Sequence, residues 1–256
     1  MTQTRCVRLN GQDDLTIAAT DLPAPDRGQV RVAVLAGGIC GSDLHYWQEG
    51  GIGTIRVREP IILGHEAAGR IRAVGPDVTH LRVGQLVAMN PSHPCGTCDF
   101  CKAGLPHHCM AMRFKGSAMY LPHEQGMFRD GITIGAAQCH PLPDTVTPGA
   151  AACAEPLAVC LHAANRAEAI AGPLAGKTVL VTGAGPIGAL CVAVARLRGA
   201  ATIIVTDIQD ATLAVARRMG ADHAVNPVAD PDGLAEWQQD KGRVDLVLSL
   251  IHISEP

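Results

Sequence analysis

The stretch from Lys177 to Asp207 limits the possible folds of this chain more than any other part of it. An apolar run, KTVLVTG, is followed by the glycine-rich turn GAGPIG, by the helical pattern PIGALCVAVARLRGA and by a second apolar run, TIIVTD. The alternation continues with DATLAVARRMGA as a helix, HAVNP as a strand, DGLAEWQQDKG as a third helix and VDLVLSL as a fourth strand. Strands that alternate with helices in this way form βαβ units and a parallel sheet.

The turn GAGPIG has the G-x-G-x-x-G spacing of a dinucleotide-binding site. The spacing alone is a weak signal, but its position between a strand and a helix strengthens the prediction. Gly183 would form the tight turn, Gly185 would let the backbone approach a pyrophosphate, and Gly188 would let the helix pack on the sheet. Pro186 and Ile187 complete the same turn. A glycine-rich turn that binds nothing is the alternative.

Asp207 ends the next strand, near the expected spacing for a carboxylate that binds the ribose hydroxyls. The residues after it, IQDATLA, contain no arginine or lysine. A 2′-phosphate would meet Asp207 and Asp210 without a cation, so the sequence favours NAD over NADP as the cofactor.

The first half of the chain predicts a β-rich domain over residues 1–150, ahead of a nucleotide-binding domain over residues 151–256. QVRVAVLAGGIC and AAGRIRAVG are short β-branched runs punctuated by glycine, as strands and turns are, while residues 90–135 have a loop-like composition. Thr147 and Pro148 suit the cap and first turn of a helix that leads into the second domain. With 47% hydrophobic residues, the 256-residue chain can bury a substantial core.

Four of the ten cysteines, Cys95, Cys98, Cys101 and Cys109, lie together in PCGTCDFCKAGLPHHC. The N-terminus has no signal-peptide pattern, so we expect a reducing cytoplasm, where such cysteines are more often metal ligands or catalytic thiols than disulfides. Four thiolates can close a tetrahedral zinc site with no open position, which predicts a structural zinc ion. The polar loop disfavours buried free thiols, and the longer last gap disfavours an iron–sulfur cluster.

A second set of potential ligands is dispersed along the chain: Cys40 in GGICGSDLHYW, His65 and Glu66 in GHEAAG, and Glu155 in CAEPLAV. Singly, each has an ordinary interpretation as a buried thiol, a core histidine or a helix-start carboxylate. Together with the four-cysteine loop and GAGPIG, however, these strings occur in the order found in zinc-dependent medium-chain alcohol and polyol dehydrogenases. The chain resembles this family from its first residues to about residue 247.

The resemblance implies an α/β protein in which a GroES-like catalytic domain is joined to a Rossmann domain with a doubly wound parallel sheet. It also implies NAD and two zinc ions, one structural and one catalytic, as cofactors. Cys40 and His65 would hold the catalytic zinc. Glu66 and Glu155 would be a ligand or lie close to the metal, and the resemblance does not decide between them.

The family pattern further implies that Ser42 takes the proton of the alcohol and relays it through the cofactor ribose to His45. Without the neighbouring motif, a helix-cap hydroxyl and an ordinary surface histidine would be the preferred interpretations. Tyr46, Phe114 and Tyr120 are candidates for the wall of the substrate pocket, with core packing as the alternative.

The substrate implied by the resemblance is a small sugar acid or polyol, oxidised at a secondary alcohol. A sugar acid carries a carboxylate, so a cation is expected near the pocket, and Arg113 and Lys115 are the candidates. The net charge of −3 and the aromatic content of 3% give no reason to expect nucleic acid or a membrane as a partner. We expect a homo-oligomer for the full-length protein. A non-catalytic zinc- and nucleotide-binding fragment is the alternative.

Chains of this family normally continue well beyond the length seen here, complete the sheet and return to the first domain. The ending SLIHISEP does not resemble the family's usual continuation after VDLVL. The sequence therefore predicts a truncated form with foreign final residues, an incomplete Rossmann sheet and an open strand edge. We accordingly expect low stability or activity of the chain as given.

Overall fold

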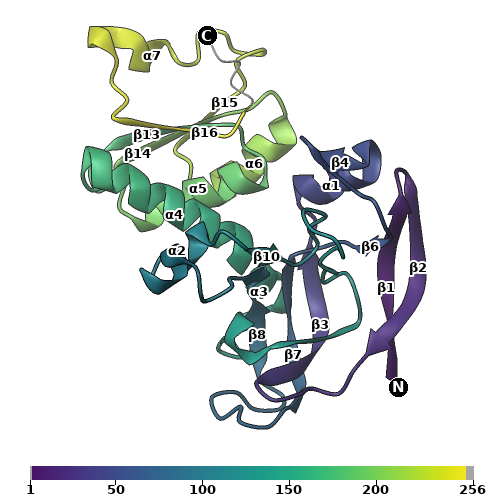
Figure 1. Ribbon diagram of the computed structural model, residues 1–256. Helices are drawn as coiled ribbons and strands as arrows, with labels where there is room; N and C mark the ends of the chain where they lie inside the picture. Colours follow the sequence, from purple (N-terminus) through teal and green to yellow (C-terminus); the bar gives the residue numbers. More distant parts are fainter. Residues whose placement is uncertain (1, 252–256) are drawn as a thin grey trace. The chain divides into compact units, whose positions relative to one another are not determined.

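The computed structural model describes residues 2–251 and divides the chain into two compact units, residues 1–155 and 156–256 (Figure 1). Residues 252–256, which belong to the ending predicted to be foreign, lie outside the described residues. Within the described part, no helix has the length and apolar character needed to cross a membrane.

An antiparallel sheet of five strands, in the order β11-β3-β7-β8-β12, forms the centre of the first unit. Its strands are β3 (Gln29–Gly38), β7 (Glu66–Val74), β8 (Leu86–Met89), β11 (Gly131–Gly135) and β12 (Cys139–Pro141). Val30 and Val32 of β3 are fully buried, as expected from the alternation of a half-buried strand. Because Gly38 pairs with Glu66, the end of β3 lies beside the start of β7.

A long hairpin covers another side of the first unit. It consists of β1 (Thr2–Gly11) and β2 (Asp14–Leu22), and β1 also pairs with β6 (Ile61–Ile62). Two short pairs complete the β-structure of the unit. They are β4 (Gly51–Ile52) with β5 (Ile55–Arg56), and β9 (Ser92–His93) with β10 (Arg113–Phe114).

The helix α1 (Gly41–Glu49) directly follows β3 and is absent from the sequence-based prediction. The side chain of Asp43 accepts a hydrogen bond from the backbone N–H of Cys40 at 3.0 Å, which caps the first turn. Gly50 ends the helix in the left-handed region, with φ of 66°. The turn chemistry at both ends therefore explains a helix that is too short to show a clear apolar period.

At the end of the first unit, the helix predicted to begin at Pro148 is confirmed. It is α3 (Pro148–Ala152), and the Thr147 hydroxyl accepts a hydrogen bond from the N–H of Ala150 at 3.3 Å. The helix α4 (Ala154–Ala171) follows almost at once, so Glu155 lies in its first turn.

The second unit contains the parallel sheet that the alternating pattern predicts, in the order β15-β14-β13-β16 (Figure 1). Its elements are β13 (Thr178–Thr182), α5 (Pro186–Leu197), β14 (Thr202–Thr206), α6 (Asp210–Arg218), β15 (His223–Val225) and β16 (Leu246–Ser249). Side chains of α4, α5, α6 and the strands form one apolar core. Among the described strands, β16 pairs with β13 alone.

The third helix predicted in DGLAEWQQDKG is wrong in its extent. The structure has one turn, α7 (Ala235–Gln238), and a 3₁₀ turn, η3 (Gln239–Lys241). Asp240 and Lys241 adopt positive φ values of 55° and 71°, which no α-helix accommodates. The segment is mostly polar and none of the residues in these two turns is buried, so packing does not hold a longer helix there.

Candidate active site and metal centres

The dispersed ligand set comes together in the first unit. The ligand atoms of Cys40, His65 and Glu66 all lie within 4.8 Å of one another. Cys40 precedes α1, while His65 and Glu66 lie at the start of β7, so the pairing of β3 with β7 brings the two segments together. A thiolate, an imidazole and a carboxylate form a donor set that suits a catalytic zinc ion with a position left for another ligand. These side chains therefore fit the metal that the family implies.

The position of the Glu66 carboxylate needs a glycine at position 38, which pairs with Glu66 across β3 and β7. A Cβ atom placed on Gly38 would lie 2.0 Å from Oε2 of Glu66. Any other residue would displace the Glu66 carboxylate from its position beside Cys40. Gly38 is thus a requirement of the site that the sequence analysis did not single out.

Asp43 is the functional residue that sequence reasoning missed. Its side chain is 3% exposed, and its two oxygens accept hydrogen bonds from the N–H groups of Cys40 and Gly64, each at 3.0 Å. Oδ1 also lies 3.8 Å from Nδ1 of His65. One buried carboxylate therefore positions both ligand-bearing segments, as outer partners of metal ligands commonly do. An aspartate three residues after Cys40 was the available signal, as a capping residue.

The electrostatics of this cluster suit a bound cation. A hydrogen bond with His65 lowers the pKa of the Cys40 thiol. Burial works to lower the pKa of His65, but the contacts with Cys40 and Asp43 outweigh it and raise that pKa. Burial raises the pKa of Glu66. Acidic groups and a polarised thiol are thus concentrated in a place with little water, where a divalent cation would stabilise their charged forms.

Glu155 lies near this cluster without being part of its compact core. It is half-buried in the first turn of α4, and burial raises the pKa of its carboxyl group, which also interacts with His65 and Glu66. Among the described residues, the compact ligand group contains Glu66 rather than Glu155. Which carboxylate binds zinc remains a prediction, and the geometry favours Glu66.

Ser42 and His45 both lie on α1, three residues apart and so on the same side of the helix. Hydrogen bonds from the backbone and side chain of Ser42 reach Cys40 and help to lower the pKa of its thiol. His45 is exposed, and its Nδ1 lies 2.8 Å from Oε1 of Glu49. The proton relay through these two residues stays a prediction.

The three aromatic candidates have different surroundings. Tyr46 is a core residue: it is 4% exposed, and its hydroxyl accepts a hydrogen bond from the N–H of Ala118 at 3.2 Å. The ring of Phe114 lies 5.4 Å from the ring of His65, centroid to centroid. Phe114 therefore contacts a residue of the ligand cluster.

The four-cysteine loop brings together a second group of side chains that could hold a metal ion. The Sγ atoms of Cys95, Cys98, Cys101 and Cys109 lie within 4.8 Å of one another, and all four cysteines are free of disulfides. The loop contains the short helix α2 (Asp99–Lys102), which begins after Cys98, and the 3₁₀ turn η1 (Pro106–His108), which ends before Cys109. This set of four thiolates fits a closed structural zinc site.

Backbone N–H groups of this loop donate hydrogen bonds to cysteine Sγ atoms. The N–H of Cys98 donates to Sγ of Cys95 at 3.4 Å, and the N–H of Cys95 donates to Sγ of Cys109 at 3.2 Å. Hydrogen bonds from Thr97, first of all from its backbone N–H, lower the pKa of Cys95 to about 6. Thiolates are the form that binds metal, so these hydrogen bonds favour the metal-binding form of Cys95, whereas burial and the neighbouring thiol of Cys98 raise the pKa of Cys101 to about 12.

The glycine turn has the geometry expected of a dinucleotide site. Gly183 has φ of +88°, and Gly185 is the residue before α5. A Cβ on Gly188 would lie 1.9 Å from the carbonyl oxygen of Gly183, whereas a Cβ on Gly185 would meet no atom within 4 Å. Gly188 therefore allows the close helix packing, and open space at Gly185 is available for a phosphate group.

Asp207, which follows β14, is tied to this turn. Its Oδ2 accepts a hydrogen bond from the N–H of Ala184 at 2.7 Å, and its Oδ1 accepts one from Gln209 at 2.8 Å. Burial works to raise the pKa of Asp207, but these hydrogen bonds outweigh it and lower the pKa. A carboxylate is thus held in its charged form beside the glycine-rich turn.

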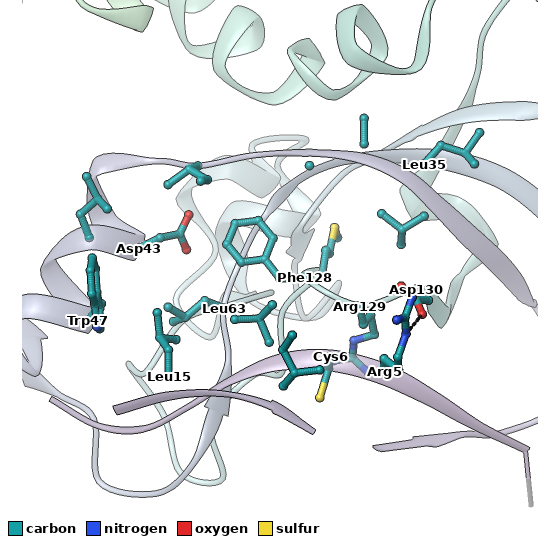
Figure 2. Close-up of a pocket in the computed structure, with 18 residues that line it drawn as sticks. Arg5, Cys6, Leu15, Leu35, Asp43, Trp47, Leu63, Phe128, Arg129 and Asp130 are labelled. Carbon is teal, nitrogen blue, oxygen red and sulfur yellow. Dashed lines mark hydrogen bonds and ion pairs between the residues drawn. The ribbon is translucent and has the colours of Figure 1, made fainter. Parts of the chain in front are cut away.

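The first unit contains a pocket of about 660 Å³, which lies between the β1–β2 hairpin, β3 and α1 (Figure 2). Leu15, Leu35, Leu63 and Phe128 are among the residues of its wall, with Arg5 and Asp130 paired at one end. A substrate with many hydroxyl groups would leave them without partners on such a wall. The pocket is therefore a poor candidate for the substrate site.

Comparisons with known proteins agree with this architecture. The chain matches the alcohol dehydrogenase GroES-like domain over residues 26–144 and the zinc-binding dehydrogenase domain over residues 186–254. It is 43% identical to the L-idonate 5-dehydrogenase (NAD(P)(+)) of Escherichia coli over 84% of this chain and 60% of that protein. It is 41% identical to a sorbitol dehydrogenase of Bacillus subtilis over 84% of this chain and 59% of that protein.

Solved structures give the same result. The crystal structure of the Escherichia coli L-idonate 5-dehydrogenase superposes with a TM-score of 0.88 at 39% identity, over 97% of this chain and 69% of that one. A structure described as a zinc-binding dehydrogenase from Sinorhizobium meliloti, bound to NADP, has a TM-score of 0.84 at 30% identity, over 99% of this chain and 71% of that one.

The fold is thus that of a zinc-binding dehydrogenase. The chain belongs to the zinc-dependent alcohol and polyol dehydrogenase family. The predicted fold class, a GroES-like domain with a partial Rossmann domain, is confirmed, as are zinc and a nicotinamide dinucleotide as the cofactors of this family. The chain spans about 60% of the length of the curated relatives that it matches.

Proposed function

We propose that this protein oxidises a secondary alcohol of a sugar acid or polyol with NAD, and that L-idonate, oxidised at C5 to the 5-keto acid, is its substrate. The compact group of Cys40, His65 and Glu66 carries the proposal of a dehydrogenase, because it fits a zinc ion with an open position. The 43% identity to the Escherichia coli L-idonate 5-dehydrogenase supports the choice of substrate.

Polyol oxidation is the second candidate. A sorbitol dehydrogenase is 41% identical to this chain, which is nearly the same as the value for the L-idonate enzyme. A structure of a 2R,3R-butanediol dehydrogenase is 28% identical. Overall sequence identity therefore identifies the family but does not distinguish an L-idonate enzyme from a sorbitol enzyme. Particular residues of the substrate site must make that distinction.

Cys40, His65 and Glu66 would hold the catalytic zinc ion, with Glu155 alongside. Zinc supplies Lewis-acid polarisation of the substrate hydroxyl, and NAD supplies the hydride acceptor. Asp43 holds the Cys40 and Gly64–His65 segments in place through its two hydrogen bonds. Ser42 would take the proton from the hydroxyl, and His45 would release it to solvent, a role to which a histidine side chain is suited.

The preference for NAD rests on Asp207. Its carboxylate is held beside the phosphate-binding turn, where it would accept hydrogen bonds from the ribose hydroxyls and repel a 2′-phosphate. Because the name of one relative includes NAD(P) and one similar structure contains NADP, the preference needs a direct test. Comparing kcat/KM for the two cofactors in the protein and in Asp207→Ala would supply it; an unchanged ratio would remove Asp207 from cofactor selection.

The function is tested by following NADH absorbance with L-idonate, sorbitol, xylitol, 2,3-butanediol and threonine. Both the zinc-loaded chain and a version extended by the corresponding region of the Escherichia coli relative should be assayed. We expect the highest kcat/KM with L-idonate. A preference for sorbitol or xylitol would establish the second candidate. No NADH from either protein with any substrate would instead favour a non-catalytic zinc- and nucleotide-binding protein.

We also infer a cytoplasmic, homo-oligomeric protein at full length. Free cysteines beside metal-binding thiols support a reducing compartment. Cell fractionation and light scattering of the extended version test these two points. Recovery outside the cytoplasm would contradict the first, and a monomer would contradict the second.

A further inference from the structure

Asn226, the residue that follows β15, joins two loops at the carboxyl edge of the parallel sheet. Its Nδ2 donates hydrogen bonds to the carbonyl oxygen of Ile208 at 3.2 Å and to Oδ1 of Asp210 at 3.0 Å. Its Oδ1 accepts hydrogen bonds from the N–H groups of Val228 at 3.1 Å and Ala229 at 3.4 Å. The amide therefore uses both of its ends: the nitrogen holds the loop after β14, and the oxygen holds the loop after β15.

The loop that Asn226 holds is also the loop that orients Asp207. The N–H of Gln209, in the middle of this loop, donates a hydrogen bond to Oδ1 of Asp207 at 2.8 Å. The backbone N–H of Asp207 donates to the carbonyl of Val225, the neighbour of Asn226, at 3.2 Å. Asn226 is thus connected to the Asp207 carboxylate through the backbone of the loop and makes no printed contact with that carboxylate itself.

Asp210 adds a second negative charge to the same loop. It is the first residue of α6, and the amide of Asn226 gives its carboxylate a defined partner at 3.0 Å. Electrostatic repulsion falls with distance, so two carboxylates in fixed positions oppose an added phosphate group more strongly than two carboxylates that can turn away from it. The position of this loop therefore bears on whether a dinucleotide with a 2′-phosphate can bind.

We propose that Asn226 is a positioning residue for cofactor selection. It would hold residues 208–210 so that Asp207 accepts hydrogen bonds from the ribose hydroxyls of NAD and both carboxylates oppose the 2′-phosphate of NADP. The inference rests on the proposed role of Asp207 and deepens it. A loop that is ordered before the ligand arrives binds more tightly, because its ordering adds no cost to binding. Loss of the Asn226 amide should therefore lower the preference for NAD.

The inference is tested by measuring the dissociation constants of NAD and NADP by calorimetry, on the zinc-loaded chain and on the extended version. Asn226→Ala should weaken NAD about fivefold and change NADP by less than about twofold, because only NAD depends on an ordered Asp207. Asn165→Ala is the matched control. It removes a hydrogen bond of 2.8 Å with Arg198, which lies at the end of α5 opposite the glycine-rich turn, and it should change neither constant.

A second variant restores the contact with its direction reversed. In the double variant Asn226→Asp with Asp210→Asn, the amide of residue 210 can donate to the carboxylate of residue 226, and the net charge of the loop is unchanged. The carboxylate can still accept hydrogen bonds from the N–H groups of Val228 and Ala229. We expect the ratio of the NADP and NAD dissociation constants to return to within about twofold of that of the unaltered protein. A double variant no better than Asn226→Ala would contradict the contact with Asp210 as the source of the effect.

The ratio of the two dissociation constants separates positioning from general stability. A purely structural role would weaken both cofactors equally, and an unchanged ratio in Asn226→Ala would overturn the inference. If the ratio changes in Asp207→Ala but not in Asn226→Ala, the role of Asp207 stands without Asn226. If the ratio changes in neither, or if both versions of the protein bind neither cofactor, the proposed cofactor selection fails and the inference fails with it.

Discussion

The two cysteine-containing metal centres of the first unit meet the same geometric criterion, yet they are encoded in different ways. In both, the ligand atoms lie within 4.8 Å of one another. The four-cysteine centre comes from one short loop, whereas the other joins Cys40 to His65 and Glu66 through the pairing of β3 with β7. The contiguous group would supply four protein ligands and leave no position for a substrate, whereas the dispersed group would supply three. The more conspicuous motif is therefore the less suited to chemistry.

The largest effect should come from breaking the dispersed centre. Cys40→Ser should lower turnover by about a thousandfold or more, equivalent to at least about 4 kcal/mol of transition-state stabilisation, because it removes a ligand of the catalytic zinc. Zinc content should fall by about one ion per chain, while the unfolding temperature changes little. Steady-state kinetics, metal analysis and thermal unfolding measure these quantities. Cys153→Ser, at an exposed cysteine, is the control, and retained activity with full zinc content in Cys40→Ser would remove Cys40 from the metal site.

Breaking the contiguous centre should give the opposite pattern. Cys98→Ser should also cost about one zinc ion per chain, but its main effect should be on stability, because closed zinc sites contribute directly to folding. A loss of about 3 kcal/mol would lower the unfolding temperature by about 6–12 °C, at about 2–4 °C per kcal/mol. The unfolding temperatures of Cys98→Ser and Cys40→Ser should be measured side by side, and we expect the lower value in Cys98→Ser. Equal unfolding temperatures in the two variants would contradict the assignment of a structural role to the four-cysteine site and a catalytic role to the Cys40 site.

The glycine turn extends the comparison to a contiguous motif without metal ligands. Gly188→Ala should destabilise the second unit by about 1–3 kcal/mol, because the added Cβ would meet the Gly183 carbonyl at 1.9 Å. Gly185→Ala is the matched variant: its Cβ meets no atom within 4 Å, so stability should be nearly unchanged. Both should weaken NAD binding about tenfold or more, measured by calorimetry. Equal stability loss in the two variants would contradict the separate roles assigned to these glycines.

Contiguous features of this protein could be predicted from sequence because their physics is local. The four-cysteine spacing, the strand–turn–helix around Gly183 and the Thr147 cap each depend on neighbours a few residues away. The helix α1 and the role of Gly38 could not be predicted, because the first has a short, weakly periodic pattern and the second depends on the register between β3 and β7. The length of α7 was overestimated because a helical composition was not matched by an apolar face to bury.

Asp43 gives the smallest expected effect and the sharpest test of how the dispersed centre is assembled. Asp43→Asn keeps the size of the side chain but turns an acceptor into a donor that faces the N–H of Cys40 or of Gly64, and it removes a charge 3.8 Å from His65. Zinc affinity at this centre should fall about tenfold, as expected when an outer partner of metal ligands is lost, while the four-cysteine centre keeps its ion. Competition with a chelator distinguishes the two ions. Asp99→Asn, at an exposed aspartate next to Cys98, is the control. An unchanged affinity in Asp43→Asn would mean that Asp43 only caps α1, and that the strand pairing alone positions the ligands.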